Sequence, residues 1–147
     1  MKDPVTVDDG IQRREVATLV ELHAWLDALA AVGGPAWVEI SGGDGAMLQV
    51  ALGRDDLSSL RFTDNAAAGP VMVSTGTVPT ALGSYDFTDR GLDRAVLAEE
   101  AIPVTVARVA VDEFVQSGHR PTAVAWHPAD PPGTVPGMSW LWNGRVA

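Results

Sequence analysis

No cysteine occurs among the 147 residues of the chain, which excludes disulfide bonds, thiolate zinc sites and cysteine nucleophiles supplied by this protein. Basic residues are also scarce. Ten Lys and Arg stand against 19 Asp and Glu, and the formal net charge is -9. A negative net charge opposes direct binding to nucleic acid or anionic lipid and suits a basic partner. The alternative is that the acidic residues only keep the protein soluble.

Long hydrophobic runs are missing as well. No uninterrupted apolar stretch approaches the roughly 18–20 residues needed to span a bilayer, and the first ten residues, MKDPVTVDDG, have no apolar signal core. We therefore expect a cytoplasmic protein with no membrane partner. The hydrophobic fraction of 46% is ordinary for a globular protein. The length suits one domain, with a core over about residues 5–127 and a tail rich in Pro, Gly and Trp over residues 128–147.

Periodicity predicts an α+β fold, in which two helices pack on one face of a mostly antiparallel sheet and an irregular C-terminal tail follows. A capping box of Thr18 and Glu21 starts the first helix, leucines at positions 19, 22, 26 and 29 form its buried stripe, and Gly33-Gly34-Pro35 ends it. The second helix is expected to start at Pro103 and to end at Gly118.

Alternating apolar residues predict strands around the helices. In the centre of the chain the alternation leaves Trp37, Glu39, Gln49 and Arg61 on one side, which indicates a sheet with one dry and one wet face. Residues 89–100 are expected to form an acidic loop. The strands are expected at residues 5–7, 12–16, 35–40, 48–52, 60–62, 70–75, 84–88 and 122–127.

Signatures of catalysis are missing from the sequence. A nucleic-acid deaminase needs a zinc ligand set such as H-x-E with P-C-x-x-C, and the chain has none. His23, His119 and His127 are too far apart in sequence to make a helical metal pair, and no serine lies in a G-x-S-x-G motif. We expect no catalytic centre, no metal and no cofactor.

Several motifs follow one another along the chain. They are a helix ending in Gly-Gly-Pro, the strand Trp37-Val38-Glu39, the turn Gly53-Arg54-Asp55, and the link Gly118-x-Arg120-Pro121-Thr122 before a tryptophan strand. In this order they resemble the first numbered Imm family of bacterial immunity proteins. The resemblance covers about Glu15 to Trp126. It implies a small α+β protein, not itself an enzyme, that neutralises a polymorphic toxin, often a nucleic-acid deaminase.

Three tryptophans and one glutamate are candidate partner-binding residues. Trp37 and Glu39 are expected to project from the wet face of the sheet, where a large indole is either covered or used for binding. The tail offers Trp140 and Trp142, which either fold back over Trp37 or dock on a partner as aromatic anchors.

The acidic segment before the second helix is the other candidate surface. Its acids are suited to entering a basic nucleic-acid groove as a phosphate mimic. The alternative is a solvated loop in which Arg90 and Arg94 pair locally with those acids. The five acids are Asp86, Asp89, Asp93, Glu99 and Glu100.

We therefore expect an inhibitor that binds a basic, nucleic-acid-acting toxin as a monomer in a 1:1 complex, occludes its substrate groove and does not bind nucleic acid directly. Two alternatives stay open. One is a small ligand-binding or accessory enzyme domain with a pocket on the wet face. The other is a chaperone or adaptor for a secreted effector.

Overall fold

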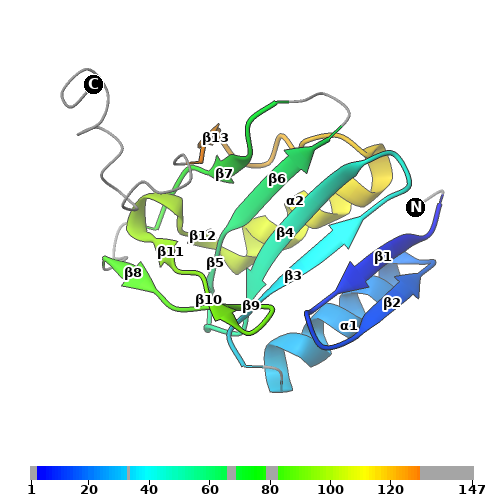
Figure 1. Cartoon of the computed structure of the whole chain (residues 1–147), viewed down its shortest axis with the longest axis horizontal. Helices are drawn as coiled ribbons and strands as arrows, with labels where there is room; N and C mark the ends of the chain where they lie inside the picture. Colours follow the sequence, from blue (N-terminus) through cyan, green and yellow to red (C-terminus); the bar gives the residue numbers. More distant parts are fainter. Residues whose placement is uncertain (1–2, 33, 66–68, 79–82, 130–147) are drawn as a thin grey trace.

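The structure is a computed structural model that describes residues 3–32, 34–65, 69–78 and 83–129 (Figure 1). The described residues form two α-helices, α1 (Leu19–Val32) and α2 (Val104–Ser117), and both lie on the same face of a mostly antiparallel sheet. This arrangement confirms the predicted α+β fold. The predicted tail, from residue 130 onward, lies outside the described residues. No helix in the described part is long and apolar enough to cross a membrane.

The large sheet runs in the order β10-β9-β3-β4-β6-β7-β13, and β1 pairs with both β2 and β3. Its pairings are antiparallel except for β9, which runs parallel to β3. The strands of this sheet are β1 (Val5–Asp8), β2 (Arg13–Val16), β3 (Ala36–Ser41), β4 (Ala46–Leu52), β6 (Leu60–Asp64), β7 (Met72–Ser74), β9 (Thr88–Asp89), β10 (Leu92–Asp93) and β13 (Trp126–Pro128).

Two short strand pairs lie beside this sheet. β5 (Leu57–Ser58) pairs with β12 (Ile102–Pro103), and β8 (Ser84–Tyr85) pairs with β11 (Val96–Leu97), which leads into a 3-10 turn at Ala98–Glu100. The predicted strand over residues 84–88 is therefore split between β8 and β9, and the predicted loop over 89–100 contains short strands. We call residues 84–101 the arch.

The helix ends follow the sequence closely. Gly118 ends α2 in the left-handed conformation, with φ of 74°, as predicted. Pro103 has an extended backbone and precedes the first helical residue, so α2 begins one residue later than predicted. Thr18 Oγ1 accepts from the Glu21 N–H at 3.1 Å, whereas the Glu21 carboxylate accepts from Ala17 and not from Thr18.

The main core fills the space between the helices and the sheet. Leu26 of α1 and Val111 of α2 are fully buried there, and the predicted leucine stripe of α1 faces it. The Phe62 ring lies 6.1 Å from the Phe114 ring and 6.3 Å from the Trp126 ring, measured between centroids. Trp126 thus packs on the core side of the sheet.

The predicted strand over residues 122–127 is wrong for its first four residues, since β13 begins at Trp126. The Thr122 N–H donates to the Glu113 carboxylate at 2.6 Å, and Trp126 Nε1 donates to the Pro121 carbonyl at 2.7 Å. These contacts bend the link back toward α2, so pairing with β7 begins only at Trp126.

Candidate functional site

Trp37 does not lie on an open face. Its neighbour Val38 packs in the core beneath the helices, so Trp37 is on the opposite face of the sheet, but it is only 2% exposed because arch residues pack over it. It packs in a second small core with Ala51, Phe87, Val96 and Ala101. The prediction of a wet face is therefore wrong at this position. Of the two alternatives for Trp37, the indole is covered, and apolar residues of the arch cover it. Trp140 and Trp142, the other possible cover, lie outside the described residues.

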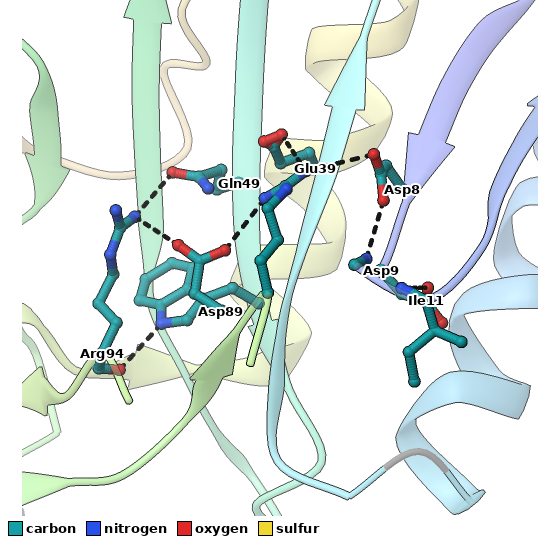
Figure 2. A network of polar contacts seen from close by, with 10 residues as sticks. Asp8, Asp9, Ile11, Glu39, Gln49, Asp89 and Arg94 are labelled. Atoms are coloured by element: carbon teal, nitrogen blue, oxygen red, sulfur yellow. Dashed lines mark hydrogen bonds and ion pairs between the residues drawn. The ribbon is translucent and has the colours of Figure 1, made fainter. Parts of the chain in front are cut away.

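A network of charges holds the arch against the sheet (Figure 2). The Arg90 guanidinium, at the tip of the β9–β10 turn, contacts Glu39 of β3, Asp8 of β1 at 3.3 Å and Asp89 of β9 at 3.0 Å. Burial disfavours the cation, but the carboxylates of Glu39, Asp8 and Asp89 outweigh it and hold the pKa of Arg90 above its usual value. Glu39 is therefore used inside the molecule and is only partly accessible to a partner.

Asp89 connects two arginines of the arch. One of its oxygens pairs with Arg90, the other lies 3.1 Å from Arg94, and its side chain is only 11% exposed. Arg94 also donates to Gln49 Oε1 of β4 at 3.1 Å. The predicted local pairing of Arg90 and Arg94 with an arch acid is confirmed for Asp89.

Two tight turns meet beside this network. Arg90 and Gly91 both have positive φ, 51° and 80°, as a two-residue hairpin turn of type I′ requires. Gly10, in the β1–β2 turn, packs so closely that an added Cβ would lie 3.2 Å from Arg90 Cα. This contact fixes the two turns relative to each other. Each turn carries or adjoins an exposed aliphatic residue: Ile11 lies in the β1–β2 turn and is 92% exposed, and Leu92 follows the β9–β10 turn and is 73% exposed.

The five acids of the arch differ in their surroundings. Asp86, Asp93 and Glu99 are exposed, whereas Asp89 and Glu100 are partly buried. Glu100 accepts a hydrogen bond from the Leu97 N–H at 3.1 Å. Burial raises the pKa of Glu100, and the hydrogen bond from Leu97 and the charges of Arg61 and His127 oppose this only in part. Three of the five predicted acids therefore face solvent and are available to a partner.

Beside the arch, the sheet face remains open as a concavity of about 490 Å³. Met47, Thr63 and Val71 contribute to its lining, together with Leu92 and the arginines at positions 61, 90 and 94. Converging His, Ser and free carboxylate groups in this concavity would favour the enzyme alternative. The described lining residues include neither His nor Ser, and their two carboxylates, Glu39 and Asp89, pair with arginine.

The histidines have separate structural surroundings. His23 contacts Asp112 through Nε2 and accepts from Arg108 at Nδ1, which joins α1 to α2 on the far side of the molecule. His127 lies 3.0 Å from the Thr75 hydroxyl, and His119 is exposed. Among the described residues no group of three or more His, Asp or Glu could hold a metal ion.

The arch is held in place by charged contacts, carries exposed acids and an exposed aliphatic residue, and lies beside an open sheet face. Such a surface suits a protein that binds another protein. A comparison of the chain with protein-family models identifies the family. The model described as "Immunity protein Imm1" matches residues 11–128, and the chain belongs to this family. The match extends from the β1–β2 turn through β13 and confirms the family resemblance of the sequence. No curated protein matches the chain at a significant level.

Proposed function

We propose that this protein binds a cognate toxin of the nucleic-acid deaminase type and inhibits it by occluding its substrate groove. Membership of the immunity-protein family is the observation that carries the proposal, since it implies a toxin partner. We further propose that it acts in the cytoplasm as a monomer in a 1:1 complex.

The outer side of the arch is the surface that we assign to the toxin. Asp86, Asp93 and Glu99 present carboxylates there, and a groove that binds nucleic acid is lined by basic side chains. Complementary charge would speed association and set the orientation of the complex. Leu92, exposed on β10, would supply an apolar anchor.

Four residues first considered for partner binding have a different role in this proposal. Trp37, Glu39 and Asp89 hold the arch in place and contribute by preorganising it. Glu100, half-buried within the arch, contributes in the same way through its hydrogen bond from Leu97. A rigid surface loses less conformational entropy on binding, so these contacts favour affinity indirectly.

Co-expression with the toxin encoded by the neighbouring gene tests this proposal. The chain should rescue growth and co-purify with the toxin at an equal molar ratio. The variant Leu92→Asp should weaken both effects, whereas the matched variant Val109→Asp, at an exposed aliphatic residue on α2, should not. If the toxin neither co-purifies with the wild-type chain nor loses its toxicity, the proposed function is wrong.

A further inference from the structure

A second concavity lies at the base of the arch, next to the turn between β4 and β5. Its volume is about 490 Å³. Most of the residues lining it are apolar, including Leu57, Val78, Tyr85 and Pro103, while Asp55 and Asp56 form an acidic edge. It is therefore a mainly apolar pocket with negative charge at its mouth.

The acidic edge is held in place by backbone contacts. The Leu57 N–H donates to the Arg54 carbonyl at 2.9 Å and closes a tight turn with Asp55 and Asp56 at its tip. Asp55 adopts a positive φ of 48°, which aspartate tolerates better than most residues. The Asp56 carbonyl accepts from the Val104 N–H at 2.7 Å, which ties the turn to the first residue of α2.

The backbone that directly precedes this turn is also constrained. Gly53 has φ of 102°, and a Cβ at this position would lie 2.4 Å from the Gly34 carbonyl oxygen. Two of the motifs that carry the family resemblance, Gly-Gly-Pro and Gly-Arg-Asp, are thus in direct contact, and both contribute residues to the pocket. The pocket is formed before any partner binds.

The cation that borders this pocket, Arg54, is already engaged. Its Nε donates to the Asp86 carbonyl at 2.7 Å, and its guanidinium carbon lies 5.7 Å from the centre of the Phe87 ring. The carboxylates of Asp55 and Asp56, and of the adjacent Asp86, are exposed. Three acids against one engaged arginine leave the mouth of the pocket negative.

We propose that this pocket receives an arginine side chain of the toxin. The inference rests on the proposed function, because a toxin that acts on nucleic acid presents arginines in its groove. An apolar lining accommodates the aliphatic stem, while paired carboxylates and a tyrosine suit a guanidinium better than an ammonium. The pocket adjoins Asp86, so it continues the surface assigned to the toxin.

The double variant Asp55→Asn/Asp56→Asn tests the pocket while preserving its size, and Asn also tolerates positive φ. A matched control, Asp3→Asn/Glu15→Gln, removes the same charge from exposed sites on the N-terminal hairpin. Affinity for the purified toxin is measured at about 50 mM and about 300 mM salt. The pocket variant should bind about tenfold more weakly with a smaller salt dependence, and the control should stay within about twofold.

An arginine-to-alanine scan of the toxin identifies the occupant through double-mutant cycles. One toxin variant should bind the wild-type chain weakly and lose no further affinity against the pocket variant. If both double variants bind equally, or no toxin arginine is coupled to the pocket, the inference is overturned and the proposed function stands. If the wild-type chain does not bind the toxin, both are overturned. Equal unfolding midpoints of the two double variants would show that folding is not the cause.

Discussion

The indole Nε1 of Trp37 donates a hydrogen bond to the backbone carbonyl of Arg94, 3.0 Å away. The bond joins β3, in the middle of the large sheet, to the arch that covers it. The side chain of Arg94 also donates to Gln49 of β4, so one residue anchors the arch through both its backbone and its guanidinium. The acidic segment is therefore a folded part of the molecule with a fixed surface.

Replacing Trp37 by Phe should destabilise the protein by about 1–3 kcal/mol, because the ring stays apolar but the Arg94 carbonyl loses its donor. Unfolding by urea, followed by circular dichroism, measures the change. The exposed Val109→Ala serves as a control and should change stability by less than about 0.5 kcal/mol. Equal stability of wild type and Trp37→Phe would show that this hydrogen bond does not hold the arch.

Replacing Asp89 by Asn should loosen the arch without unfolding the protein. The carboxylate bridges Arg90 and Arg94. Its loss should lower the free energy of unfolding by only about 1 kcal/mol, because both arginines are partly exposed and solvent screens their ion pairs. Hydrogen exchange should become faster over residues 84–101 and stay unchanged in α2. Asp93→Asn, at an exposed acid of the same hairpin, should leave exchange unaffected. Unchanged exchange in Asp89→Asn would contradict the role assigned to the network.

The helices were predictable because their periodicity depends on neighbouring residues only. Leu22 and Leu26 lie one turn apart and are both buried, and Gly118 ends α2 through its own backbone conformation. The central strands β3, β4 and β6 follow from alternation for the same reason. These elements form the main core, so most of the fold follows from local pattern.

The arch was not predictable in this way. Its strands are two residues long, too short to show any alternation, and they form because Phe87 and Val96 pack against Trp37, about 50 residues away along the chain. Two local signals were available and were missed. Arg90-Gly91 is a pair compatible with a hairpin turn, and Phe87 is a large apolar residue between Asp86 and Asp89.

The sequence could locate the candidate site as a segment of the chain, but it could not assign roles to the individual residues within it. Asp89 and Asp93 have the same side chain and lie four residues apart, yet Asp89 pairs with two arginines and Asp93 faces solvent. The difference comes from strands β1, β3 and β4, which supply Asp8, Glu39 and Gln49 to the network. Long-range contacts of this kind leave no local pattern in the sequence.

Glu100 should make stability depend on pH in a direction opposite to that of most carboxylates. Since its pKa is raised in the folded state, its contribution to stability is fully present below the unfolded pKa and is lost as the pH rises through the folded pKa. Glu100→Gln should therefore be more stable than wild type at about pH 7.5 and equal to it at about pH 4. Urea unfolding at both values measures this. A destabilised variant at about pH 7.5 would contradict the assignment.

Replacing Gly53 by Ala should be strongly destabilising, by about 2 kcal/mol or more, because φ is positive and the added Cβ would clash with the Gly34 carbonyl. Gly43→Ala is the matched control, since nothing lies within 4 Å of the Cβ added there. Its effect should be below about 1 kcal/mol. Thermal unfolding of both variants compares them, and equal midpoints would rule out the close contact between the two glycine motifs.

Titration of the purified toxin with this protein, with the toxin's activity on nucleic acid as the readout, tests the central claim most directly. We predict that deaminase activity falls linearly and is abolished at one molar equivalent of the chain. Undiminished activity in the presence of a large excess would contradict the account.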